Sequence, residues 1–330
     1  MTAYRTCGVT IDSFIDLPDL PVCNFRAEVV VRPEKLGRPP SIDPGDDRSR
    51  SADTDTMEIV WPRVGCFRIT DRTITVRPDQ GVDDALLRLY LMGPALGVLL
   101  HLRGTLVLHG SAIEMDGGAV SFVGDSGSGK STLACALHLR GYRVLSDDLA
   151  AVARLDGLWQ LFAGSSSLKL WPDTVRVLRC REATLERIHH RSEKRSYLAI
   201  QAAPPRSMPI RRVYILRFGS SIKIERVAPK QVLSDLIRNG YCRSVVSRSD
   251  ASSYFLQCSQ LARDVSCRYL YRTRHPSTIG QLASAVERDL GSRSVASESN
   301  EGHEGVPTHS TSHLASCSAI CPTPPEELGN

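Results

Sequence analysis

A glycine-rich segment constrains the fold of this 330-residue chain more than any other feature. It matches the pattern Gly-x4-Gly-Lys-Ser/Thr and consists of Gly124, Asp125, Ser126, Gly127, Ser128, Gly129, Lys130 and Ser131, with Thr132 next. In this pattern the glycines let backbone N–H groups turn inward around phosphates, the lysine reaches the β and γ oxygens, and the hydroxyl ligates Mg²⁺. An apolar run precedes the segment and a helical pattern follows it. We therefore predict that residues 124–132 bind a nucleoside triphosphate, with Lys130 on the phosphates and Ser131 on the metal.

The residues after this phosphate loop favour a kinase over a motor ATPase. The predicted helix ends at Arg140-Gly141, with a cation in its last turn and a glycine cap. A strand-like run over 142–146 then leads into Asp147 and Asp148, and Asp147 follows Lys130 by only 17 positions. At this spacing the carboxylates lie on the next strand, whose end can reach the bound metal, whereas a motor ATPase carries the corresponding acid much later. Two adjacent carboxylates also occur at solvated strand ends. The functional interpretation of this pair therefore depends on the phosphate loop that precedes it.

The residues before the loop predict a β-hairpin. Two apolar or alternating runs, at 105–115 and 119–123, flank the tight turn Asp116-Gly117-Gly118. Most phosphate-loop folds reach the loop from a parallel strand whose partners are connected through helices. A hairpin that leads directly into the loop is therefore unusual.

The set formed by His109-Gly110, the hairpin, the loop and Asp147-Asp148 resembles the HPr kinase/phosphorylase superfamily. The core of that superfamily is also related to ATP-dependent phosphoenolpyruvate carboxykinase. The resemblance implies an α/β fold with a phosphate-loop core fed by the hairpin, a smaller β-rich N-terminal region, and ATP and Mg²⁺ as cofactors. It also implies that His109 orients Asp148, that Asp148 is the general base, and that Asp147 and Ser131 hold the metal. Which aspartate has which role is not fixed by the sequence.

Segments outside this set indicate which members of the superfamily the chain resembles. Residues 164–173 do not match the Arg-Gly-rich signature of true HPr kinases, so a phosphorylase activity is not expected. The run 168–173, the start of the chain and Glu193-Lys194-Arg195 look like the HPr-kinase-like proteins encoded beside lasso-peptide biosynthesis genes. This likeness implies phosphorylation of a serine hydroxyl in a peptide or small protein, a lasso precursor with a C-terminal serine being one acceptor. An HPr-type regulatory kinase, a kinase of free serine or another small metabolite, and a non-catalytic ATP-binding sensor remain alternatives.

The distribution of basic residues adds two candidates and excludes one class of partner. Of the 41 basic residues only six are lysines, and Lys169 and Lys194 fall in distinctive segments after the acidic pair. Either lysine could stabilise the transferring phosphoryl group or bind the acceptor, and a plain surface position is as good an interpretation. The net charge of +5 is mild and the arginines are scattered, so we expect no nucleic acid partner.

The remaining composition is that of a cytoplasmic globular protein. No run of 18 apolar residues exists and no apolar segment follows the first residues, so we expect neither a membrane span nor a secretion signal. The ten cysteines form no Cys-x2-Cys pair and are expected to be reduced thiols. Self-association into a homo-oligomer is left open.

We predict three parts along the chain. Residues 1–102 form a β-rich region with a disordered loop at 37–56, strands at 57–77 and a helix at 83–102 that is interrupted near Pro94. Residues 103–290 form the kinase domain, with further strands at 158–163 and 210–217 and helices at 173–189, 228–240, 251–265 and 277–290. Residues 291–330 have few large apolar side chains and are expected to be disordered.

Overall fold

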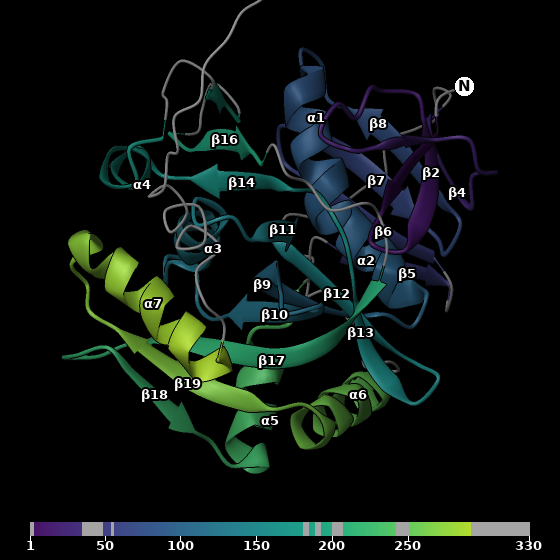
Figure 1. Ribbon diagram of the computed structural model, residues 1–330. Helices are drawn as coiled ribbons and strands as arrows, with labels where there is room; N and C mark the ends of the chain where they lie inside the picture. Colours follow the sequence, from purple (N-terminus) through teal and green to yellow (C-terminus); the bar gives the residue numbers. More distant parts are fainter. Residues whose placement is uncertain are drawn as a thin grey trace, which may run out of the picture.

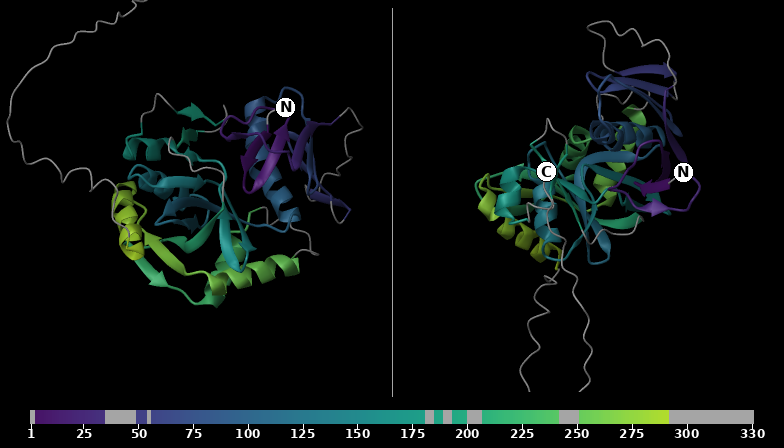
Figure 2. Two further views of the ribbon diagram at one scale, coloured as in Figure 1. Left: turned by 45° about the vertical axis from the view of Figure 1, so that its right-hand side comes forward. Right: turned by 90° about the horizontal axis from the view of Figure 1, so that it is seen from above.

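The computed structural model describes residues 3–34, 49–53, 56–180, 185–188, 193–199, 207–241 and 251–291. Two eight-stranded sheets and one three-stranded sheet are combined with helices, so the chain is a mixed α/β protein (Figure 1). The N-terminal sheet lies beside the second sheet, and the helical segment at 84–102 runs along it (Figures 1 and 2).

The N-terminal region is β-rich, as expected. Its sheet has the spatial order β3 (Val22–Cys23), β1 (Ala3–Thr6), β2 (Val9–Ser13), β4 (Val29–Pro33), β8 (Thr73–Pro78), β7 (Gly65–Ile69), β6 (Thr56–Trp61) and β5 (Ser49–Asp53). Along β8 the side chains alternate, and Ile74 and Val76 are buried. The expectation of disorder over 37–56 is wrong for 49–53, because these residues pair antiparallel with β6. Residues 37–48 and 54–55 lie outside the described residues.

The helical segment that follows the sheet changes its geometry midway. It consists of α1 (Asp84–Tyr90), a π-helical turn η1 (Leu91–Ala95) and α2 (Leu96–Leu102). Asp83 caps it, because its carboxylate accepts the N–H of Leu86 at 2.8 Å. The predicted interruption near Pro94 is therefore present as the π turn, since proline has no N–H to continue the α-helical pattern.

This helical segment also bears on the expectation that no membrane span exists. By length and composition Asp84–Leu102 could cross a membrane, with a mean hydropathy of 1.6, although half of it is buried inside the molecule. Leu87, Leu91 and Leu99 belong to the apolar cluster beneath the N-terminal sheet. Core helices of globular proteins can pass the same test of length and composition, so the expected absence of a membrane span stays a prediction.

The second sheet carries the phosphate loop. Its strands are β10 (Gly118–Val123), β9 (Leu106–Met115), β12 (Leu149–Leu155), β13 (Leu158–Phe162), β17 (Ser207–Phe218), β19 (Cys267–Arg272) and β18 (Lys223–Arg226), with β11 (Arg143–Ser146) beside β9. The predicted hairpin is confirmed, because β9 and β10 pair antiparallel around residues 116–117. The strand β10 also pairs in parallel with β17, so β10, β9, β12, β13 and β17 are hydrogen-bonded around a closed circuit.

The acidic pair directly follows β11, which confirms the expectation that a strand leads into it, and it lies in a short break before β12. The strands β11 and β12 both pair antiparallel with β9, one after the other. Asp147 and Asp148 occupy the interruption, opposite Gly110 and Ser111 of β9. The pair is thereby held between two paired segments instead of at a free edge.

Helices cover both faces of the second sheet (Figure 1). One face packs against α3 (Lys130–His138) and α7 (Ile279–Leu290), and the other against α5 (Pro229–Arg238) and α6 (Ala251–Asp264). These helices agree with the predicted ranges to within a few residues. Before α7 lies the 3-10 turn η3 (Pro276–Thr278).

A three-stranded sheet of β14 (Ser167–Leu170), β16 (Arg195–Leu198) and β15 (Glu186–Arg187) completes the fold. The helix predicted at 173–189 is wrong for residues 178–180 and 185–188, because α4 (Pro172–Val177) is short and Glu186–Arg187 pairs with β16, while 181–184 and 189 lie outside the described residues. The predicted tail lies outside the described residues from 292 onward. The division at residue 102 stays a prediction, since the N-terminal apolar cluster includes Val107 and Leu149 from the other side of it.

Candidate functional site

The phosphate loop joins the end of β10 to the start of α3, the predicted strand-loop-helix order. Two of its glycines are required by close approach as well as by positive φ. At Gly124, with φ of 149°, a Cβ would lie 2.9 Å from the carbonyl oxygen of Leu216, and at Gly129, with φ of 97°, it would collide with the guanidinium of Arg272. Gly129 caps α3, so the N–H groups of the first helical turn face the loop.

Lys130 lies across the loop as the first residue of α3. Its Nζ donates to the carbonyl oxygens of Gly124 at 2.8 Å and Asp125 at 3.0 Å. Burial lowers the pKa of Lys130 to about 8, against the opposing charges of Asp147 and Asp148. A buried ammonium group held by carbonyl oxygens is well placed to exchange them for phosphate oxygens.

Asp147 is buried beneath the loop and accepts three hydrogen bonds. They come from Ser111 Oγ at 2.5 Å, Ser131 Oγ at 2.9 Å and the backbone N–H of Lys169 at 2.9 Å. Burial and the neighbouring charge of Asp148 raise the pKa of Asp147, although these three donors act in the opposite direction. The contact with Ser131 places a carboxylate oxygen beside the hydroxyl that the sequence assigns to the metal.

Asp148 points to a different set of groups. His109 Nδ1 lies 3.2 Å from one of its carboxylate oxygens, and Lys169 Nζ lies 2.7 Å from the other. Burial would raise the pKa of Asp148, but the hydrogen bond from His109 and the charge of Lys169 hold it well below its usual range. Asp148 also has a φ of +74°, a left-handed conformation that aspartate tolerates better than most residues.

Alternation along β9 brings two of its side chains to the acidic pair, one to each carboxylate. His109 and Ser111 are two positions apart and therefore project from the same face of the strand. His109 meets Asp148, and Ser111 meets Asp147. Between them, Gly110 brings the strands close, because a Cβ there would lie 2.8 Å from the carbonyl oxygen of Phe122.

The cavity at the loop holds about 250 Å³. It is lined by His109, Ser126, Gly127, Gly129, Lys130, Ser131, Thr132, Asp147, Asp148, Lys169, Trp171, Asp173, Thr174, Val177, Lys194, Arg272 and Pro276. The predicted catalytic and metal-binding residues thus meet in one cavity, together with both candidate lysines. Gly124 and Asp125 contribute carbonyl oxygens to Lys130 from outside it, and Ser128 is buried under the loop.

Two residues at this site were missed by the sequence analysis. Ser111 could have been found, because it follows His109 by two positions on a predicted strand. Arg272 ends β19, is buried, and donates from Nη1 to the carbonyl oxygen of Ser128 at 3.2 Å. It lies 142 positions after Lys130, and only the pairing of β17 with both β10 and β19 brings it to the loop.

The donor set fits a nucleotide with Mg²⁺. Carboxylate and hydroxyl oxygens, as in Asp147 and Ser131, are ligands of hard cations. Among the described residues, no group of three His, Cys, Asp or Glu side chains could hold a metal by itself. A Mg²⁺ ion here would therefore share its coordination with phosphates and water, its usual mode in phosphotransferases.

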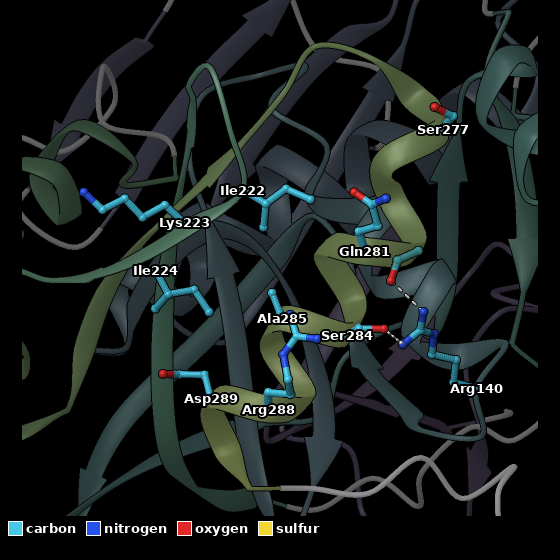
Figure 3. A pocket seen from close by; sticks show the side chains of 11 residues that line it. Arg140, Ile222, Lys223, Ile224, Ser277, Gln281, Ser284, Ala285, Arg288 and Asp289 are labelled. Atoms are coloured by element: carbon cyan, nitrogen blue, oxygen red, sulfur yellow. Dashed lines mark hydrogen bonds between the residues drawn. The ribbon is translucent and has the colours of Figure 1, made fainter.

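A larger hollow lies away from the loop, between α7 and β18 (Figure 3). Its volume is about 930 Å³, and Arg140, Lys223 and Arg288 give it a basic character. The guanidinium of Arg140 is already engaged, because it donates to Ser284 Oγ at 2.9 Å and to the carbonyl oxygen of Gly280 at 2.6 Å. Its lining includes neither the phosphate loop nor the acidic pair, so size alone does not identify the functional cavity.

Comparison with known proteins gives little beyond this geometry. No family model and no curated protein matches the chain. Among solved structures, the Hpr(Ser) kinase/phosphatase from Coxiella burnetii is similar, with 11% identity over 56% of this chain and 98% of that chain and a TM-score of 0.30. A TM-score of 0.30 does not establish a shared fold, so the function is inferred from the site itself.

Proposed function

We propose that this protein is an ATP-dependent phosphotransferase that moves the γ-phosphoryl group of ATP to a serine hydroxyl of a peptide or small protein. The observation that supports this proposal is that the two carboxylates contact different groups. Asp147 contacts Ser131 of the phosphate loop, whereas Asp148 contacts His109 and Lys169. A protein that only binds nucleotide needs a carboxylate beside Ser131, but it does not need a second carboxylate held by a histidine and a lysine.

In the proposed reaction the acceptor oxygen forms a bond to the γ-phosphorus, and the bond from that phosphorus to the oxygen bridging to ADP breaks. The proton of the acceptor hydroxyl passes to Asp148, which His109 holds in place. Phosphoryl transfer relies on positioning and charge stabilisation more than on strong base catalysis. The lowered pKa keeps the Asp148 carboxylate ionised, and departure of Lys169 from Asp148 would remove one cause of the lowering and so strengthen the base.

The cations around the cavity supply the charge stabilisation. Lys130 and Arg272 come from the start of α3 and the end of β19, and Lys169 and Lys194 come from β14 and the residue before β16. In this proposal Lys169 leaves Asp148 and contacts the transferring phosphoryl group when the nucleotide binds. A bound Mg²⁺ would neutralise phosphate charge between Ser131 and Asp147.

The sequence resemblance supports the same class of reaction and suggests acceptors to test first. A lasso precursor peptide is one, and the HPr protein and free serine are others. Because residues 164–173 lack the phosphorylase signature, we expect no reversal by inorganic phosphate. Use of ATP and Mg²⁺ fits a cytoplasmic location.

Replacement of the proposed base tests this function. We expect Asp148→Asn to lower the transfer rate by roughly 10²- to 10⁴-fold, the usual contribution of a positioned base, with near-normal Mg²⁺-ATP affinity. Asp156→Asn is the matched control, because Asp156 also has a positive φ but lies exposed in the turn between β12 and β13. Transfer would be followed by mass spectrometry of a serine-peptide panel and affinity by calorimetry.

The outcomes separate the alternatives. Transfer by Asp148→Asn at the rate of the Asp156→Asn control would overturn the assignment of the base. Tight nucleotide binding with no transfer to peptide, HPr or free serine would favour the sensor. Loss of nucleotide binding in Asp148→Asn, with binding retained in Asp147→Asn, would exchange the roles of the two carboxylates.

A further inference from the structure

A second cavity lies on the other side of the acidic pair. Its volume is about 190 Å³, and Asp147, Asp148 and Lys169 line both it and the nucleotide cavity. The two carboxylates therefore form a partition between the two spaces. A group bound in the second cavity can reach Asp148 without crossing the phosphate loop.

The walls of this second cavity differ in chemistry. The N-terminal region provides an apolar wall of Leu17, Leu20, Leu89 and Met92, with Asp19 and Arg88 among the other lining residues. The lining also carries the hydroxyls of Ser165, Ser167 and Ser196, from β14, β16 and the residues before β14. Ser167 Oγ and Ser196 Oγ share one hydrogen bond, which leaves the hydrogen of one hydroxyl and lone pairs on both for a bound group. The cavity thus combines an apolar surface with hydroxyl groups that can bind a peptide backbone.

The apolar wall explains why α1 and η1 are so hydrophobic. Leu87 and Leu91, four positions apart, face the core of the N-terminal region and are buried. Ala85 and Leu89, also four positions apart, form a different face and line the cavity while remaining only half-buried. Met92 lines the cavity beside them and also packs against the apolar cluster of the N-terminal region. Met92 lies within the π turn, a feature that is frequent at functional sites.

We propose that this second cavity, hereafter the acceptor cavity, binds an extended peptide segment in which the reacting serine has an aliphatic neighbour. The inference rests on the phosphotransferase function proposed above. The aliphatic side chain would cover Leu89 and Met92, and the serine hydroxyl would lie at Asp148. Free serine fits less well, because it has no apolar group to remove these two side chains from water. In this proposal the N-terminal region recognises the acceptor peptide, while the phosphate-loop region binds the nucleotide.

Two peptides of equal length and a small molecule probe this proposal. They are Gly-Leu-Ser-Leu-Gly, Gly-Asp-Ser-Asp-Gly and free serine, each with Mg²⁺-ATP and the full chain. We expect kcat/KM for the leucine-flanked peptide to exceed that for the aspartate-flanked peptide and for free serine by at least about tenfold, the discrimination of an apolar subsite.

Two variants change the wall in different ways. Met92→Trp fills the acceptor cavity, and Leu89→Gln reverses the polarity of the wall with little change in volume. Each is expected to lower kcat/KM for the leucine-flanked peptide by about tenfold or more while the affinity for Mg²⁺-ATP stays within about twofold. Leu158→Trp is the control, because Leu158 is 60% exposed on β13 and lies outside both cavities.

The results that contradict this inference differ from those that contradict the proposed function. Equal transfer to the three probes, preference for free serine, transfer to HPr but to none of the three probes, or wild-type transfer by both wall variants would each overturn the acceptor cavity. Nucleotide binding with transfer neither to these probes nor to HPr would instead contradict the phosphotransferase and favour the sensor. Failure of the wild-type chain to bind Mg²⁺-ATP would overturn the phosphotransferase itself.

Discussion

The two cavities that meet at the acidic pair are built in opposite ways. The nucleotide cavity is centred on one continuous stretch, residues 124–132, which supplies the phosphate loop, and other parts of the chain add the acidic pair and further cations around it. The acceptor cavity is assembled from side chains that are far apart in sequence, from Leu17 to Ser196. Phosphate is the same in every nucleotide and can be bound by a fixed loop, whereas an acceptor surface must match one partner.

The largest expected effect comes from a substitution in the nucleotide cavity that leaves the acceptor cavity unchanged. Lys130→Met removes the buried ammonium group that lies across the loop, and we expect phosphoryl transfer to fall by about 10³-fold, as for loss of one preorganised transition-state donor. Methionine keeps the length of the side chain, so the fold should persist. A rate within tenfold of wild type, measured with the best peptide, would contradict the phosphate-loop assignment.

A smaller effect tests whether Arg272 contributes to nucleotide binding. Arg272→Gln removes a charge-assisted donor at the loop, and we expect the Kd for Mg²⁺-ATP to rise by about 10- to 100-fold. Arg274→Gln is the matched control, because Arg274 is exposed two residues further along and does not line the cavity. Calorimetry distinguishes the two variants. Equal affinities would show that Arg272 only packs against the loop.

The smallest effect concerns the partition between the cavities. Ser111→Ala takes one of three donors from Asp147, and we expect the Mg²⁺ concentration for half-maximal transfer to rise by a few-fold, since the other two donors still hold the carboxylate in place. Ser121→Ala is the control, because Ser121 is equally buried on the neighbouring strand and its hydroxyl has no partner among the described residues. A Mg²⁺ requirement unchanged in both variants would mean that Ser111 does not tune the metal site.

The two cavities also differ in how far the sequence predicts them. The loop and the hairpin followed from local patterns, because strand alternation and glycine spacing act over a few residues. The closeness of His109 to Asp148 was implied by the family resemblance, and no local pattern indicates it. The acceptor cavity could not be predicted, since it depends on how the helix at 84–102 packs against the second sheet. That helix was expected from its apolar residues, but their division into two faces requires the tertiary structure.

The failures at secondary-structure level have a similar origin. Residues 49–53 are polar and predict disorder, yet backbone pairing with β6 makes them a strand. Residues 186–187 continue a helical pattern but pair with β16 instead. In both places a partner strand, which no local pattern reveals, decides the conformation.

The left-handed backbone of Asp148 has an evolutionary consequence. Asparagine accepts this conformation as readily as aspartate, and the two residues are separated by a single-nucleotide change. Loss of the base by that route would leave the strand break, the loop and the nucleotide cavity in place. A lineage carrying this fold could therefore pass from enzyme to pseudokinase in one step without first losing stability, and an asparagine at this position in a related genome would be the trace of it.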